Sequence, residues 1–299
     1  MPTKTKAKKD VYQAVTDRVI AALEECTVPW QRPWQVVGGI HKNLNSKRAY
    51  RGINQMLLDM TSLLNNYTSP YWMSYKQAKV LGGQVRKGEV GTYVVFFKPI
   101  KIETDEIDKK TGKPKIKTIP LIRDYVVFNL EQVEGIDPKK IPAITSHEEF
   151  TPIQRAERVI KGMPNPPKMY HGGDVASYNV ETDVIRMPAR KQFHTAEGYY
   201  ATDFHERVHS TRHSSRLDRY KAGNREGRAK EELVAELGSS MLCAIVGIDN
   251  DRQQDQTAAY IKSWLRALKD DKKLIVSAGS QAHRACEYIL GEIKEEEKS

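Results

Sequence analysis

The chain has 299 residues, of which 39% are hydrophobic and 29% are charged, and its formal net charge is +10. It is long enough for two domains, and it contains no apolar run of the roughly 18 residues that a membrane-spanning helix requires. Because no apolar segment follows the basic N-terminus, we expect no secretory signal, no membrane partner and a cytoplasmic location. The three cysteines, Cys26, Cys243 and Cys286, form no C-x-x-C motif and indicate no disulfide framework, which leaves His and carboxylate side chains as candidate metal ligands.

Positive charge is concentrated in the first half of the chain. Residues 1–150 contain 24 Lys and Arg against 16 Asp and Glu, a balance of +8, whereas the remainder contains 24 against 22, a balance of +2. A basic half next to a nearly neutral half predicts two domains with different partners. A polyanion such as nucleic acid is the expected partner of the first.

The first elements in the chain predict an α+β domain over residues 10–133, preceded by a disordered basic tail at 1–9. Asp10 is placed to cap a helix that runs to about Glu25, since apolar residues recur after it at helical spacing. Residues 101–118, which are charged and contain Gly and Pro, are expected to form an exposed hairpin or a flexible loop. Two further helices and two strands are expected over 52–63, 75–81, 92–99 and 125–128.

A proline-rich, acidic stretch at 134–152 is the predicted linker to a second, mainly helical domain, which we expect to cover residues 153–299. Its first helix opens at Pro152, a residue type that is favoured at the first helical position. A small antiparallel sheet is expected next, as a hairpin with strands at 176–180 and 184–187. The remaining helices are predicted at 195–210, 225–246, 253–269 and 276–293. The expected fold class of the whole chain is therefore α+β.

His205, Glu206 and His209 form an H-E-x-x-H pattern inside the helix predicted at 195–210. The two imidazoles are four residues apart, so they lie on one face of a helix and can reach one metal ion. Glu206, which follows the first ligand, is placed to act as a general base on a water molecule at the metal. The pattern predicts a metallopeptidase centre; the alternative is two surface His on a solvated helix.

A third protein ligand is required, and the best candidates lie 22 to 27 residues after His209, in the segment EELVAE. On a helical wheel, Glu232 and Glu236 share a face with small residues, which would let another helix approach closely, whereas Glu231 lies off that face. We therefore predict Glu232 as the ligand and Glu236 as the residue that orients an imidazole, with the reverse assignment left open. The ligand types favour Zn²⁺, with Mn²⁺ or Co²⁺ as substitutes.

Aromatic and basic residues alternate in the first domain in a way that suits single-stranded DNA, whose bases are free to stack. A protein that reads duplex DNA would instead be expected to show a recognition helix with polar, base-reading residues. The alternative is that the aromatic side chains fill the core. The candidate DNA-binding residues are Trp30, Arg32, Trp34, Arg48, Tyr50, Arg51, Trp72, Lys76, Arg86 and Lys87.

Six motifs follow one another along the chain: VPWQRPW at 28–34, YRGIN at 50–54, VVFFKP at 94–99, HERVHST at 205–211, EELVAE at 231–236 and YIKSWL at 260–265. In these motifs and their order, the chain resembles plasmid antirestriction proteins of the ArdC type over most of its length. The N-terminal half is similar to the single-stranded-DNA-binding domain of that family, which also occurs in plasmid primases of the TraC type. The C-terminal half is similar to its zincin-like peptidase domain.

This resemblance implies a gluzincin-type site of His205, His209 and one Glu of the EELVAE segment, with Glu206 as the catalytic residue. It also implies that the protein binds incoming single-stranded plasmid DNA and protects it from host restriction during conjugation. A DNA-bound or restriction-related protein would then be the substrate of the peptidase. The alternative is a single-strand-binding protective protein whose peptidase domain is structural, or inactive in isolation.

Overall fold

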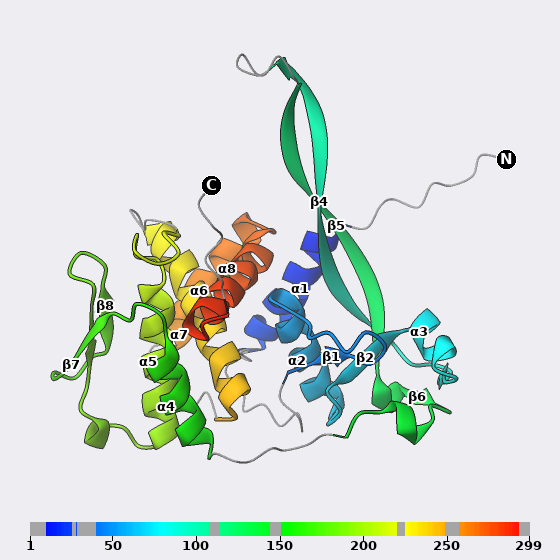
Figure 1. The fold of residues 1–299 in the computed structure, drawn as a ribbon, viewed down its shortest axis with the longest axis horizontal. Coiled ribbons are helices and arrows are strands. Elements are labelled where there is room, and N and C mark those ends of the chain that lie inside the picture. Colours follow the sequence, from blue (N-terminus) through cyan, green and yellow to red (C-terminus); the bar gives the residue numbers. More distant parts are fainter. Residues whose placement is uncertain are drawn as a thin grey trace.

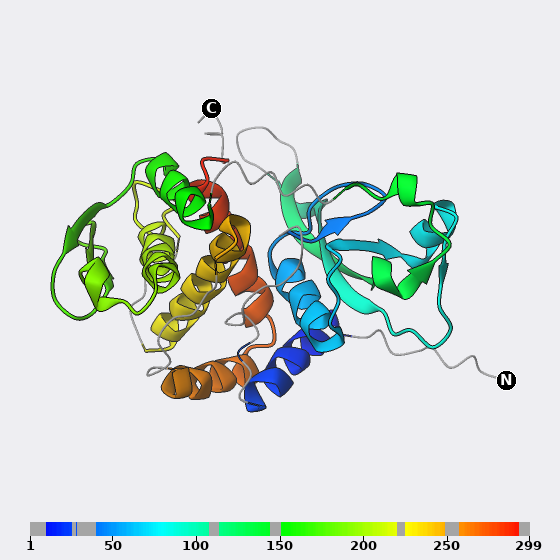
Figure 2. The same ribbon diagram turned by 90° about the horizontal axis from the view of Figure 1, so that it is seen from below.

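The structure, a computed structural model, describes residues 10–25, 28, 40–107, 114–143, 151–219, 225–248 and 257–292. It consists of a sheet with a long projecting hairpin on one side and a bundle of helices with a small sheet on the other (Figures 1 and 2). Mixed helices and strands confirm the predicted α+β class. The predicted tail at 1–9 and the candidate DNA-binding residues Trp30, Arg32 and Trp34 lie outside the described residues.

The N-terminal half is organised around a four-stranded sheet with the order β1-β2-β5-β4. β1 is parallel to β2, and the other neighbours are antiparallel. Its elements are α1 (Val11–Glu24), β1 (Lys42–Asn43), α2 (Ile53–Asn65), β2 (Tyr71–Ser74), α3 (Tyr75–Val80), β3 (Gln84–Val85), β4 (Thr92–Ile107), β5 (Pro114–Asn129) and β6 (Val133–Glu134). As predicted, Asp10 caps α1, since its side chain accepts a hydrogen bond from the backbone N–H of Gln13.

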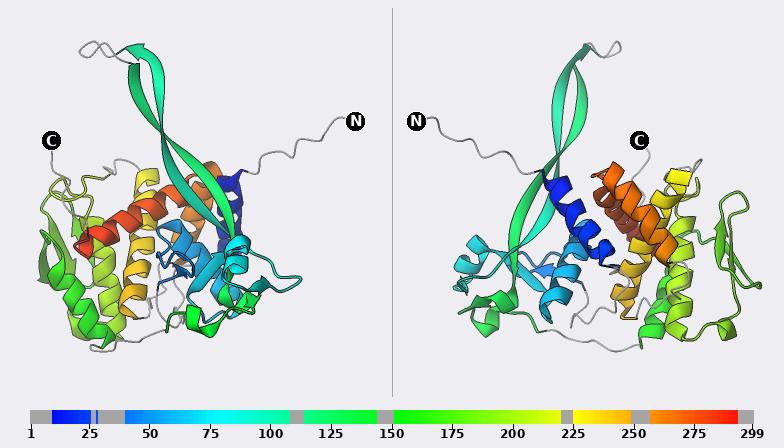
Figure 3. Two further views of the ribbon diagram at one scale, coloured as in Figure 1. Left: turned by 45° about the vertical axis from the view of Figure 1, so that its right-hand side comes forward. Right: turned by 180° about the vertical axis from the view of Figure 1, so that it is seen from behind.

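The strands predicted at 92–99 and 125–128 are much longer in the structure, because β4 and β5 form a hairpin whose register continues out to the pair Ile107 and Pro114. The hairpin leaves the body of the molecule as a twisted arm (Figure 3). Of the two alternatives for residues 101–118, the structure therefore shows the hairpin. Two paired strands satisfy each other's backbone hydrogen bonds without a core beneath them, and at the base of the arm Val94 and Val127 are buried.

In its described part, the C-terminal half consists of five α-helices, a short 3-10 helix (Arg190–Gln192) and a three-stranded sheet. The helices are α4 (Pro152–Gly162), α5 (Ala196–Ser210), α6 (Arg225–Val246), α7 (Thr257–Asp270) and α8 (Leu274–Ile289), and the strands are β7 (Lys168–His171), β8 (Ser177–Asn179) and β9 (Val184–Met187). The β8–β9 hairpin is antiparallel, as predicted, but β7 pairs with β9 in parallel. The prediction of a small antiparallel sheet is therefore correct for β8 and β9 and wrong for β7, whose four residues are too few to stand out in the sequence.

One hydrophobic core connects the two halves. Apolar residues of α1 and α2, among them Val19 and Leu57, belong to the same buried cluster as those of α5 to α8. The contact between α2 and α8 is close, because a Cβ atom added at Gly279 would lie 3.0 Å from the backbone nitrogen of Ile53. Within the predicted linker, β6 pairs with β3, and Ile141 packs on a cluster of the N-terminal half. The boundaries at 133 and 153 stay predictions, but the two halves share their largest core.

Candidate metal centre

Helix α5 brings the two histidines of the H-E-x-x-H pattern to one point. It begins after Thr195, whose hydroxyl accepts a hydrogen bond from the backbone N–H of Gly198, and it spans the whole pattern as predicted. His205 and His209 are 4% and 8% exposed, and their Nε2 atoms lie 3.0 Å apart. Two imidazoles whose ring nitrogens face one another in this way can bind one cation between them once both nitrogens have lost their protons.

Helix α6 supplies the third side chain at this point. Glu232 Oε2 lies 3.4 Å from His205 Nε2 and 3.6 Å from His209 Nε2. Glu236 lies on the opposite side of the first ring, with its Oε1 atom 3.5 Å from His205 Nδ1. Within the described residues, one ligand atom each from His205, His209 and Glu232 lies within 4.8 Å of the other two. The geometry thus favours Glu232 over Glu236 as the third ligand.

Small residues allow α6 to reach α5. Ser239 donates a hydrogen bond to the carbonyl oxygen of Ala201, and a Cβ atom added at Gly238 would lie 2.7 Å from a methyl group of Val208. This confirms the prediction that another helix packs closely on the small-residue face of α6. The close contact is needed because a glutamate side chain must span the gap between the two helices to meet the imidazoles.

Glu231 has a contact that the helical wheel did not predict. Its Oε1 atom lies 3.0 Å from His209 Nδ1, and both carboxylate oxygens accept hydrogen bonds from Arg219, at 2.6 and 2.9 Å. Arg219 also donates to the carbonyl oxygen of Val208 and to the hydroxyl of Thr211. The helical wheel assigned no role to Glu231, because a wheel describes one helix alone and cannot show that His209 reaches the side of α6 on which Glu231 lies. The one sequence feature that could have indicated this contact is the pair of adjacent acids, Glu231 and Glu232, which project from different sides of that helix.

The electrostatics of this cluster suit a divalent cation. Burial disfavours the charged form of His209, but hydrogen bonds to Glu231 and Glu232 outweigh burial and raise its pKa to about 10. Burial also acts to raise the pKa of the two carboxyl groups, yet their contacts with the histidines hold the pKa of each below its usual value. The two carboxylates that stabilise the protonated imidazole create a negative electrostatic potential at this point. The same potential favours a metal cation, so the donor set fits a metal ion.

Glu206 lies next to the ligands on α5 and is 5% exposed. One residue along a helix turns the side chain by about 100°, so Glu206 borders the face that carries both histidines. On a further side of α5, Asp203 and Arg207 form a buried ion pair at 2.8 Å, and Arg207 also contacts the sulfur of Met163. These contacts fix the helix that carries the candidate catalytic residue.

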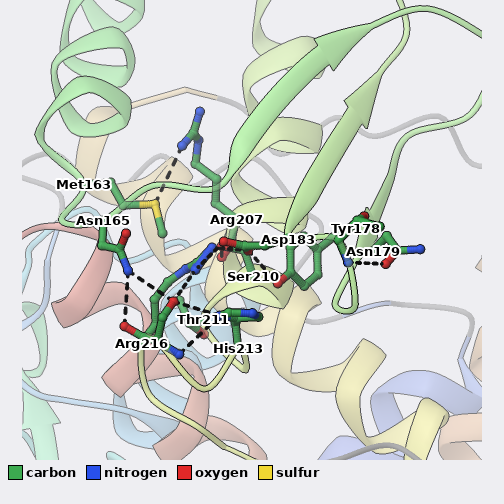
Figure 4. A network of polar contacts seen from close by, with 12 residues as sticks. Met163, Asn165, Tyr178, Asn179, Asp183, Arg207, Ser210, Thr211, His213 and Arg216 are labelled. Atoms are coloured by element: carbon green, nitrogen blue, oxygen red, sulfur yellow. Dashed lines mark hydrogen bonds and ion pairs between the residues drawn. The ribbon is translucent and has the colours of Figure 1, made fainter.

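Hydrogen bonds and an ion pair hold the loop after α5, residues 211–219, against the small sheet (Figure 4). Arg216, whose side chain is fully buried, forms an ion pair with Asp183 in the turn between β8 and β9, and the hydroxyl of Tyr178 donates to the same carboxylate. Asn165 donates a hydrogen bond to Ser215 in that loop. The β8–β9 hairpin is therefore held beside α5 and the loop that follows it, and β8 is an edge strand of its sheet.

Trp72 does not fit its predicted role. It is fully buried, and its indole N–H donates to Nδ1 of His41 at 3.0 Å; His41 in turn pairs with Asp59. The prediction that Trp72 stacks on DNA is wrong for this reason: its ring faces contact the core. The alternation of aromatic and basic residues did not distinguish a buried strand residue from an exposed one. Tyr50 is half-buried, with its hydroxyl 3.2 Å from Asn43 Nδ2.

The candidate cations are placed differently from one another. Arg48, Lys76 and Lys87 are exposed. Arg86 is also exposed and forms an ion pair with Glu89 at 2.6 Å. Arg51 is 72% exposed at its side chain and contacts Glu287 of α8 at 3.2 Å. Arg51 thus links the N-terminal half to the helical half, whereas the other four line the free surface of the N-terminal half.

The two-histidine helix, the facing glutamate and the adjoining small sheet define a zincin-like metallopeptidase domain. The family model described as "Zincin-like metallopeptidase" matches residues 154–281. A second model, described as the N-terminal domain of anti-restriction factor ArdC, matches residues 9–128. Two crystal structures of the antirestriction ArdC protein from plasmid R388 are each 40% identical to this chain. The metal-free structure has a TM-score of 0.75 and covers 96% of this chain and 100% of its own; for the Mn(II)-bound structure these values are 0.74, 95% and 98%. The chain therefore belongs to the ArdC antirestriction family.

Longer proteins contain a similar segment. Two proteins from Escherichia coli named DNA primase TraC are each 36% identical over 95% of this chain, but the chain spans only 27% and 20% of their lengths. The uncharacterized protein y4eC from Sinorhizobium fredii is 34% identical over 94% of this chain and 91% of its own length. Among the helices that the structure describes, none is long and apolar enough to cross a membrane.

Proposed function

We propose that this chain is a DNA-associated zinc metallopeptidase that protects incoming plasmid DNA from host restriction during conjugation. The observation that carries the proposal is the convergence of His205, His209 and Glu232 on one point beside Glu206, in a member of the ArdC family. The Mn(II)-bound state of the related R388 protein supports a divalent cation at this point. Zinc is our choice of ion, since two imidazoles and one carboxylate are typical of a catalytic zinc site.

The side chains of the centre have distinct roles in the proposed reaction. His205, His209 and Glu232 would hold the ion, and zinc when bound would polarise the peptide carbonyl and make a water molecule more acidic. Glu206 is placed to accept the proton of that water and to deliver it to the departing amine nitrogen. Glu231 would accept a hydrogen bond from Nδ1–H of His209. The lone pair on Nε2 of that ring is then available to bind the ion.

The substrate of this centre would be an unidentified protein that binds in an extended form. The edge of β8, held beside α5, offers backbone groups to which an extended peptide can add as a further strand. Such binding would place a peptide bond near Glu206 without a deep side-chain pocket.

Zinc is expected to bind to the purified chain at one ion per molecule, and Glu232→Gln is expected to weaken binding by more than the roughly 10–100-fold typical of residues that only support a ligand. Metal analysis after dialysis, together with a competition titration against a chelator, measures both quantities. Glu197→Gln, in the first turn of the same helix, is the matched control and should bind as the parent does. Full zinc affinity in Glu232→Gln would contradict the assignment of this residue.

We propose in addition that the exposed cations of the N-terminal half bind single-stranded DNA. Arg48, Lys76, Arg86 and Lys87 are exposed there, and the half carries most of the net positive charge of the chain. This surface needs no metal, which favours one alternative function: protection of DNA by binding alone, with the peptidase domain in a structural role. The TraC primases that share the segment support a partner of this kind.

Neutralisation of two adjacent cations, Arg86→Gln with Lys87→Gln, is expected to weaken binding to single strands and to flatten its salt dependence. Each phosphate contact on a single strand contributes about 0.7 to the slope of log affinity against log salt, so the loss of two contacts lowers the slope by about 1.4. Fluorescence anisotropy over a salt series measures it, with Lys161→Gln and Lys191→Gln in the helical half as the control. An unchanged slope would remove this turn from the interface.

A further inference from the structure

One face of the hairpin formed by β4 and β5 continues from the core into solvent. At its base, Val94 on β4 and Val127 on β5 are 3% exposed and pack with Trp72 and Leu58. Side chains alternate along a strand, so the next residues on this face are Phe96 on β4 and Tyr125 on β5. The strand register places Tyr125 opposite Val94 and Arg123 opposite Phe96. These three residues therefore lie together on one face of the hairpin, next to its buried base.

Two large aromatic rings are left in solvent at this place. Phe96 is 62% exposed and Tyr125 is 47% exposed. Their ring centroids are 6.0 Å apart, and the rings meet edge to face at 83°. This contact fixes both rings with respect to each other while much of their surface stays uncovered. Exposed aromatic pairs of this kind usually mark an interaction site, because burial of each ring against a partner is favourable.

The neighbouring charge identifies the kind of partner. Arg123 is exposed beside the pair, and residues 1–150 carry an excess of eight positive charges. A polyanion with flat, apolar groups would satisfy both features, and single-stranded DNA has this combination: unpaired bases that stack on aromatic rings, and phosphates that pair with arginine. Bases in a duplex already stack on one another, so a duplex offers the rings no free face.

We propose that Phe96 and Tyr125, with Arg123 beside them, form a stacking platform for the bases of single-stranded DNA. This inference rests on the proposed DNA binding and names the surface that carries it. It replaces Trp72, which the structure buries, as the aromatic contact. The strand would cross the base of the arm, with its bases against the rings and a phosphate at Arg123.

The test compares single-strand binding by Phe96→Ala, Tyr125→Ala and the double variant, measured by fluorescence anisotropy. Each single variant is expected to bind an oligothymidine about 5–150-fold more weakly, the range that corresponds to the loss of one base–aromatic stack. An abasic strand of equal length and charge should bind all variants as it binds the parent. Tyr125→Phe should retain full affinity, since stacking needs the ring and not the hydroxyl. Tyr170→Ala, an exposed tyrosine on β7, is the matched control.

Different outcomes contradict the stacking platform and the proposed binding of single-stranded DNA. If the parent chain binds no single strand, the proposed DNA binding fails, and this inference fails with it. If the parent binds and the double variant binds oligothymidine equally well, only the platform is overturned. Sedimentation of both proteins decides what covers the rings in that case: a parent that self-associates while the double variant stays monomeric assigns the surface to a second copy. Equal losses on oligothymidine and on the abasic strand would also overturn the platform, since stacking requires bases.

Discussion

Glu206→Gln is expected to reduce peptide hydrolysis by roughly 10²–10⁴-fold, the usual contribution of a general base, while the chain continues to bind zinc. Glutamine has nearly the shape of glutamate but cannot accept the proton, and residue 206 is not one of the three side chains that converge on the metal point. Hydrolysis of an unstructured protein such as casein, measured beside the zinc content of the same preparation, provides the comparison. Glu197→Gln on the same helix should leave hydrolysis unchanged.

The same substitution distinguishes the two proposed modes of protection. If proteolysis is required, a plasmid that encodes Glu206→Gln should enter a restricting recipient as poorly as a plasmid that lacks the gene, and both should enter a non-restricting recipient normally. If DNA binding alone protects, the variant should transfer as well as the parent. Single-strand affinity should be equal in both proteins, since the platform and the cations lie in the other half. Transfer at the parental level would exclude a peptidase role in antirestriction.

Glu231→Gln is expected to weaken zinc binding by about 10–100-fold, the range for residues that hold a metal-bound histidine. The loss follows from the charge of the carboxylate, which makes His209 a better ligand through its contact with Nδ1 at 3.0 Å. The substitution also leaves Arg219 without its carboxylate, at a position where the side chain is 8% exposed. Breaking a buried ion pair on one side destabilises a protein by about 3–5 kcal/mol, so a lower melting temperature is expected as well.

A double variant separates these two effects. Glu231→Gln with Arg219→Gln removes the unpaired guanidinium, so the metal-free protein should recover much of its stability, while zinc affinity stays low. Denaturant unfolding of the metal-free chain and chelator competition measure the two quantities independently. Recovery of zinc affinity in the double variant would show that Glu231 acts through the fold alone and has no direct effect on His209.

The agreement between sequence and structure is best where the pattern is local. The helix that carries His205 and His209 spans 196–210 against a prediction of 195–210, and α6 has the predicted bounds of 225 and 246. Helical periodicity, a Thr cap and small residues on one face are features of residues that lie close together in the sequence, so they can be recognised without knowledge of the packing. The helical wheel placed Glu232 and Glu236 on one face and left the choice between them open, and the distances from Glu232 to the two Nε2 atoms favour Glu232 as the ligand.

The errors and omissions concern contacts between distant segments. Trp72 and Phe96 are both aromatic residues in strands of a basic half, yet one is fully buried and the other is 62% exposed. Their difference depends on where the sheet ends and the arm begins, which the pairing of β2 with β5 decides. β7 has no clear pattern in the sequence, because its four residues form a strand only when β9 lies beside them.

The sequence by itself determined the helices, the pair of imidazoles on one face of α5 and the basic character of the first half, since these follow from spacing and charge along the chain. Only the tertiary structure decided which acids meet the two rings, and it added Glu231 and Arg219 to the centre. It also decided which aromatic residues face solvent, and joined the two halves through a shared core. The physical reason is the same in each case: side-chain burial and the pairing of carboxylates with histidines depend on how helices and strands pack, and packing brings together residues that no local pattern relates.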